Sequence, residues 1–164
     1  MINRYFRFGI AIFLMCALTA CASKPPEPVK MKAQIIASET LNPDRNGISK
    51  PVVVRIYQLK TPGTFQGADF FSLYRDADAV LAADLLSSQE IMMQPGSSKQ
   101  LEAEFDPAAR VIGVLAAFRD IENAIWRTSL ALPEDKLIKF FDKRQMLVNL
   151  EDRTITLKFD EPPE

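Results

Sequence analysis

The stretch that decides the fold is Pro51-Val52-Val53-Val54-Arg55-Ile56-Tyr57-Gln58-Leu59. It is rich in β-branched and aromatic residues, which favour strands, and its proline fits only the start or the edge of a strand. A second stretch, residues 111–118, is apolar throughout, as expected for a central strand covered on both faces. These two stretches predict a β-sheet protein.

Six further segments show the alternation of a half-buried strand, in which every second residue is apolar. They are residues 29–38, 88–93, 100–105, 124–132, 145–151 and 154–159. With the two stretches above they make about eight strands joined mostly by short connections. This pattern predicts an all-β protein, a two-sheet antiparallel β-sandwich.

Residues 64–86 break the period of two, because large apolar side chains recur at helical spacing from Phe70 to Tyr74. We expect one or two short helices here, inserted between strands two and three. Asp76 or Asp78 should stand near the N-terminus of the second helix. The apolar side of the helices should pack on the sandwich.

The N-terminus has the composition of a secretory signal peptide. Arg4 and Arg7 precede an apolar run over residues 8–18, and small residues follow. The run is short for a transmembrane helix, which needs about 20 apolar residues. We expect residues 1–20 to be a cleaved lipoprotein signal peptide, with an uncleaved anchor as the alternative.

The signal ends in Leu18-Thr19-Ala20-Cys21, which resembles the bacterial lipobox. In lipoproteins of that class the Cys thiol receives a diacylglyceryl group and the chain is cut before it. Each buried methylene adds about 0.8 kcal/mol, so two or three acyl chains anchor a protein stably. The resemblance implies a covalent lipid on Cys21. Three prolines predict an extended tether over residues 21–28, and the strand pattern predicts a folded domain over residues 29–164.

The residues after Cys21 bear on where such a lipoprotein is anchored. In this class an Asp directly after the lipidated Cys tends to retain the protein at the inner membrane, and Ala22 and Ser23 carry no such signal. The resemblance therefore implies an anchor in the outer membrane, with the domain facing the periplasm.

The composition excludes much of enzyme chemistry. The 164-residue chain has no histidine and a formal charge of -1. Acid–base catalysis by His and metal ligation by His are therefore absent, and the charge balance gives no reason to expect nucleic-acid binding. We expect no enzyme activity, no metal, no small-molecule substrate and no cofactor beyond the lipid.

Two other classes stay open as alternatives. A carboxylate hydrolase would need two acids that converge in a cleft, but helix capping and a solvated strand face are the favoured explanations of the available acids. These acids are Asp76, Asp78, Asp84, Glu102 and Glu104. A periplasmic module that binds a small ligand or a glycan would need a concave apolar site, for example around Trp126.

One connection is too long for a tight hairpin turn. Residues 39–50, between the first two strands, contain the turn signals Asn42-Pro43-Asp44 and Asn46-Gly47. Loops of this kind on a rigid scaffold often carry binding surfaces. Because the loop has few large apolar groups, we expect replacement of residues 42–46 to cost no more than about 1 kcal/mol of stability.

Residues 42–47, followed by residues 51–59, resemble the signature of the TssJ family, also called VasD or SciN. Residues 68–74, 83–86 and 94–96 continue the resemblance in order. Members of the family are outer-membrane lipoproteins of the type VI secretion system. The resemblance implies a transthyretin-like β-sandwich with a small helical addition.

The resemblance also implies a role, a partner and a contact region. The lipoprotein would tether the trans-envelope complex by binding the periplasmic C-terminal domain of the inner-membrane protein TssM, through the loop between strands one and two. Carried over to this chain, the contact residues are Leu41, Asn42, Pro43, Asp44, Arg45, Asn46, Gly47, Ile48, Ser49 and Lys50. Those expected to supply the polar contacts are Asn42, Asp44, Arg45 and Asn46.

Overall fold

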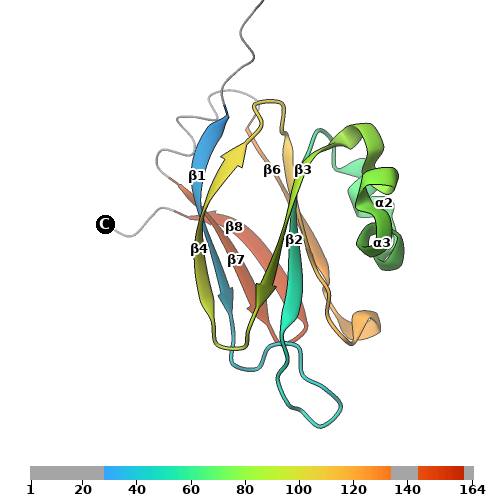
Figure 1. Ribbon diagram of the computed structural model, residues 1–164, viewed down its shortest axis with the longest axis vertical. Coiled ribbons are helices and arrows are strands. Elements are labelled where there is room, and N and C mark those ends of the chain that lie inside the picture. The colour runs from blue at the N-terminus through green and yellow to red at the C-terminus, as the bar shows by residue number, and fades with distance from the viewer. Residues whose placement is uncertain (1–27, 134–143, 161–164) are drawn as a thin grey trace, which may run out of the picture.

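Two four-stranded β-sheets pack face to face in the computed structural model of the protein (Figure 1). The structure describes residues 28–133 and 144–160. One sheet has the strand order β4-β1-β7-β8 and the other β3-β2-β5-β6. The strands are β1 Val29–Ala37, β2 Val52–Leu59, β3 Leu85–Met93, β4 Ser98–Phe105, β5 Val111–Ala116, β6 Arg127–Ala131, β7 Gln145–Glu151 and β8 Thr154–Asp160. The predicted all-β sandwich is confirmed.

One strand pair departs from the antiparallel arrangement. β1 runs antiparallel to β4, with Ala33 opposite Leu101, but parallel to β7, with Ile35 opposite Val148. The first sheet is therefore mixed, whereas every pair in the second sheet is antiparallel. Side chains alternate with period two in both kinds of ladder, so the sequence pattern does not distinguish them.

The main core lies between the two sheets, because alternate residues of each strand point toward the facing sheet. Its fully buried members come from strands of both layers, and include Ile35, Val54, Phe105, Val114, Met146 and Val148. Full burial of an aliphatic or aromatic side chain contributes about 1.5–3 kcal/mol. This core therefore holds the two layers together.

A helical segment between β2 and β3 covers the outer face of the second sheet (Figure 1). It consists of α2 Gly63–Gly67, α3 Phe70–Leu81 and a 3-10 helix over Ala82–Asp84. A second cluster of buried side chains lies beneath it, made of Tyr57, Leu59, Phe65, Phe70, Leu73, Leu81, Val111 and Leu115. β5 is buried along its whole length, as the sequence predicts for a strand covered on both faces.

Asp76 divides α3 into two segments. Its backbone leaves the helical region, with φ -151° and ψ 71°, and its carboxylate accepts a hydrogen bond from the backbone N–H of Ala79 over 3.1 Å. Asp76 therefore caps the second segment, as predicted. The predicted helical range of 64–86 runs too far, since Leu85 and Leu86 belong to β3 and Leu85 pairs with Leu59 of β2.

The expected signal peptide over residues 1–20, Cys21 and the tether as far as residue 27 lie outside the described residues. The first strand, β1, starts at Val29. Among residues 28–133 and 144–160, no helix is long and apolar enough to span a membrane.

Candidate functional site

The candidate site is the connection over residues 38–51, called here the β1–β2 loop. β1 and β2 belong to different sheets, so the chain must cross between layers that lie about 10 Å apart. A tight hairpin turn cannot span that distance, which explains the length of the loop. The loop lies at the end of the sandwich opposite the start of β1 (Figure 1).

The inner part of the loop is built into the protein through Asn42, which is only 2% exposed. Its backbone is left-handed, with φ 48°, a conformation that Asn tolerates better than most residues. The side-chain Nδ2 donates to the carbonyl of Pro51 over 2.7 Å, and Oδ1 accepts from the backbone N–H of Arg119 over 2.8 Å. Its backbone N–H donates to the carbonyl of Asp152 over 2.7 Å.

Asn42 therefore has a structural role and ties three segments of the chain together. Leu41, beside it, is fully buried in the main core. Both side chains are buried in the domain, and partner contact through them stays a prediction. For Asn42 we now expect replacement to cost more than the about 1 kcal/mol expected for the loop from its sequence, because a buried polar group without its partners costs about 1–3 kcal/mol.

The outer part of the loop folds around Asp44. Its Oδ1 accepts hydrogen bonds from the backbone N–H groups of Asn46 and Ile48 over 2.9 and 3.0 Å, and Lys50 Nζ lies 3.4 Å from Oδ2. The backbone N–H of Gly47 donates to the carbonyl of Asp44, and the turn places Gly47 at φ 77°. Glycine suits this position because it has no Cβ.

These contacts shift the pKa of the Asp44 carboxyl below its usual value. The hydrogen bond from the Ile48 N–H has the largest effect on the pKa, and burial opposes it with the next largest. The hydrogen bonds from Asn46 and Lys50 then lower the pKa further. Hydrogen bonds to a carboxylate favour its charged form. Asp44 therefore acts within the loop, as an anionic centre that holds the turn.

The remaining residues form an exposed tip. Arg45, Asn46, Gly47 and Ile48 are exposed, and Ile48 keeps 55% of its surface accessible. Pro43, Ser49 and Lys50 are half-buried. Of the ten residues predicted for contact, the four at the tip are the ones that the structure presents to solvent.

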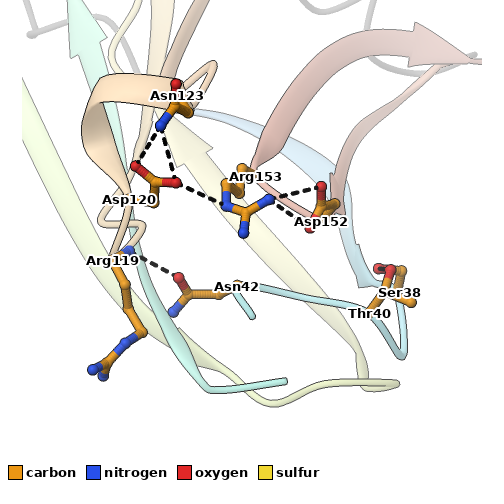
Figure 2. A network of polar contacts seen from close by, with 8 residues as sticks. All are labelled: Ser38, Thr40, Asn42, Arg119, Asp120, Asn123, Asp152 and Arg153. Carbon is orange, nitrogen blue, oxygen red and sulfur yellow. Dashed lines mark hydrogen bonds and ion pairs between the residues drawn. The ribbon is translucent and has the colours of Figure 1, made fainter. Parts of the chain in front are cut away.

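A network of charged residues supports the loop from two neighbouring segments (Figure 2). Arg153, in the turn between β7 and β8, lies with Nε 3.3 Å from Asp120 Oδ2 and with Nη1 3.3 Å from Asp152 Oδ2. Asn123 Nδ2 donates to both oxygens of Asp120. Asp120 and Asn123 lie in the connection between β5 and β6, which includes a 3-10 helix over Ile121–Asn123.

Sequence reasoning did not find this network. Asp120 and Arg153 are far apart in the chain, and neither stands in a motif. They meet because the connection and the turn lie at the same end of the sandwich, where Ile125 forms a parallel bridge to Thr154. Only the strand order reveals that proximity.

An open hollow of about 770 Å³ lies between the β1–β2 loop and these segments. The loop contributes residues 43–46 to its lining, and the other segments contribute Arg119, Asp120 and Arg153. The lining is mostly polar and charged. The hollow therefore suits a polar protein surface better than an apolar ligand.

Two of the acids considered for hydrolysis make contacts within the protein. The Asp84 carboxylate accepts hydrogen bonds from the hydroxyls of Thr61 and Thr64, and Glu104 lies 3.9 Å from Lys30 on an exposed strand face. Among residues 28–133 and 144–160, no group of three acids or other ligand residues is placed to hold a metal ion.

Trp126 is used for packing. Its ring meets Phe70 edge to face with centroids 5.3 Å apart, and the Arg127 guanidinium lies 4.6 Å from the ring centroid. The Arg127 side chain also donates hydrogen bonds to the carbonyls of Phe65 and Ala68. These contacts fasten the helical segment to β6.

The fold and the site define a β-sandwich protein that holds an ordered loop, with an exposed tip, at one end. The sequence model of the type VI secretion lipoproteins, described by the names VasD, EvfM and TssJ, matches residues 29–153. The chain belongs to this family. The family is a structural lipoprotein component of type VI secretion.

Solved structures agree with this assignment. TssJ1, a type VI lipoprotein from Pseudomonas aeruginosa, is 29% identical with a TM-score of 0.74, over 83% of this chain and 99% of that one. Lip from Serratia marcescens, a membrane-bound component of the type VI secretion system, is 28% identical with a TM-score of 0.72, over 79% and 96%.

A third similar chain comes from a structure described as the C-terminal domain of the type VI secretion protein TssM from EAEC. It is 30% identical with a TM-score of 0.61, over 79% of this chain and 97% of that one. A comparison with curated proteins found no match.

Proposed function

We propose that this chain is a lipoprotein of the outer membrane that tethers the type VI secretion complex by binding the periplasmic C-terminal domain of TssM. Membership of the type VI lipoprotein family supports the proposal. So does the similar chain from a structure named for the TssM C-terminal domain. The lipid would be carried by Cys21, at the end of the signal described above.

The observation that carries the proposal is the placement of the two ends of β1. The strand begins at Val29, directly after the proposed tether, and the β1–β2 loop lies at the far end of the sandwich (Figure 1). A strand of nine residues rises about 30 Å. A lipid on Cys21 would hold one end of the domain at the membrane and direct the loop away from it.

The rigidity of the loop suits a tether. A binding surface that is already ordered loses less conformational entropy on association. The hydrogen bonds of Asn42 and Asp44 order the loop that carries the tip. We assign the direct contact to Arg45, Asn46 and Ile48, whose side chains are exposed. Leu41, Asn42 and Asp44 support that contact without making it.

The test is a tip variant, R45S/N46S/I48S, which keeps Gly47 and Asp44. The mature lipoprotein in detergent micelles is titrated against the periplasmic C-terminal fragment of TssM by biolayer interferometry. We expect affinity to fall more than tenfold with an unchanged Tm, since these side chains make no buried contact. Arg75→Gln, on the exposed side of α3, is the matched control and should bind as the wild type does. Equal affinity of the tip variant and the wild type would refute the proposed contact.

A further inference from the structure

We propose that the partner surface extends from the loop tip to Arg119, and that Arg45 and Arg119 together bind a carboxylate-bearing, acidic segment of the partner protein. This inference rests on the proposed function and adds to it the chemistry of the contact. Charged residues of both signs line the hollow beside the β1–β2 loop.

The acids around the hollow already have ion-pair or hydrogen-bond partners within the protein. Asp44 is paired with Lys50 and two backbone N–H groups. Asp120 is paired with Arg153 and Asn123, and Arg153 also pairs with Asp152. A carboxylate that is paired this way has little remaining capacity to attract a cation.

The two remaining arginines are not neutralised. Within residues 28–133 and 144–160, neither Arg45 nor Arg119 has an ion pair or a side-chain hydrogen bond, and both side chains are exposed. In Figure 2 the guanidinium of Arg119 points away from the polar network. The hollow therefore carries an excess of positive charge. The planar guanidinium groups of Arg45 and Arg119 can each bind a carboxylate through two parallel hydrogen bonds.

The backbone holds these two arginines in a fixed relation. The N–H of Arg119 is hydrogen-bonded to Oδ1 of Asn42, and Arg45 follows Asp44, whose carboxylate organises the tip. The side chains start from ordered positions on either side of one hollow. Such preorganisation favours a ligand with carboxylates at matching separation.

Two apolar side chains in the segments around the hollow are also exposed. Ile48 is 55% exposed and Ile125 is 58% exposed. Ile48 is the last residue of the tip, and the backbone N–H of Ile125 donates to the carbonyl of Arg153. Arginine next to exposed apolar groups is typical of the energetically important centre of a protein interface.

The position of the hollow favours a protein partner over a lipid headgroup. The hollow lies with the β1–β2 loop, at the end of the sandwich opposite Val29 (Figure 1). With the lipid anchor at the Val29 end, as proposed, the two arginines face away from the anchoring membrane. An acidic segment of the partner therefore fits the site better than an anionic phospholipid of that membrane.

The test uses single substitutions in the mature lipoprotein in detergent micelles, titrated against the periplasmic TssM fragment. We expect Arg119→Gln and Arg45→Gln each to weaken binding ten- to a hundredfold, on the order of a lost charge-assisted hydrogen bond. Raising NaCl from 50 to 300 mM should weaken wild-type binding, and the double variant should lose most of that dependence. Arg75→Gln, an exposed arginine on α3, is the control and should behave as the wild type in both respects.

The outcomes separate the two proposals. If the tip variant R45S/N46S/I48S binds weakly but Arg119→Gln binds as the wild type does, this inference is overturned and the proposed function stands. If the wild type does not bind the fragment, both are overturned. If the arginine variants lose binding to phosphatidylglycerol vesicles and keep their affinity for the fragment, the surface is a lipid site and this inference is again overturned. Unchanged Tm values exclude unfolding as the cause.

Discussion

Oδ1 of Asn42 accepts a hydrogen bond from the backbone N–H of Arg119, which lies 77 positions further along the chain, over 2.8 Å. The bond joins the connection between β1 and β2 to the one between β5 and β6. Because Nδ2 of the same side chain donates to Pro51, one buried amide fixes two sides of the β1–β2 loop. The exposed tip depends on this residue.

Asn42→Ala should lower the free energy of unfolding by about 2–4 kcal/mol. The change leaves the N–H of Arg119 and the carbonyl of Pro51 without partners and places Ala at φ 48°, which a Cβ disfavours. Urea denaturation measures the loss. Asn46→Ala, an exposed asparagine of the same loop, is the control and should change stability by less than about 0.5 kcal/mol. Similar stabilities for both variants would contradict the structural role of Asn42.

Asp44→Asn should lower Tm at neutral pH, and the difference should shrink in acid. The hydrogen bond from the Ile48 N–H and the other contacts lower the pKa of Asp44 below 3.8. The carboxylate therefore contributes stability above pH 3.8 that is lost as the pH falls through its folded pKa. Thermal melting of both proteins between pH 7 and pH 2.5 tests this. A Tm difference that stays constant with pH would show that the charge of Asp44 has no effect.

Gly113→Ala should destabilise the contact between the helical segment and β5. A Cβ at position 113 would lie 2.9 Å from Cε1 of Phe65, and Phe65 is a buried member of the cluster beneath the helices. Overpacking of this kind costs about 1–3 kcal/mol. Gly67→Ala is the control, because a Cβ there meets nothing within 4 Å. In a double-mutant cycle with Phe65→Leu, the free energies of unfolding lost by the two single variants should sum to more than the free energy lost by the double variant.

Cys21→Ser should abolish lipidation and release the protein from the membrane. The thiol of the residue that ends the signal is the proposed acceptor of the lipid. Fatty-acid labelling and membrane fractionation measure both effects. Ala22→Asp should remain labelled but move toward the inner membrane on a density gradient. A Cys21→Ser protein that still carries acyl chains would rule out the lipobox assignment.

Local patterns of sequence determined the fold class. Apolar and polar residues alternate along β8, and β5 is apolar throughout; each pattern reflects the burial of a single strand. Helical spacing of apolar residues from Phe70 onward indicated α3. These patterns extend over a few residues, because the direction of a side chain follows from the geometry of its own strand or helix. The order of motifs from residue 42 to residue 96 likewise carried the resemblance to the family that the comparison of residues 29–153 shows.

Only the tertiary structure decided how the site is assembled. The parallel pairing of β1 with β7, the burial of Asn42 and the meeting of Asp120 with Arg153 all depend on segments far apart in the chain. Exposed turns and buried turns are both rich in Asn, Asp and Gly, so composition does not tell them apart. What separates Asn42 from Asn46 is the presence of Arg119 and Pro51 within hydrogen-bond distance, and that is set by the packing of the two sheets.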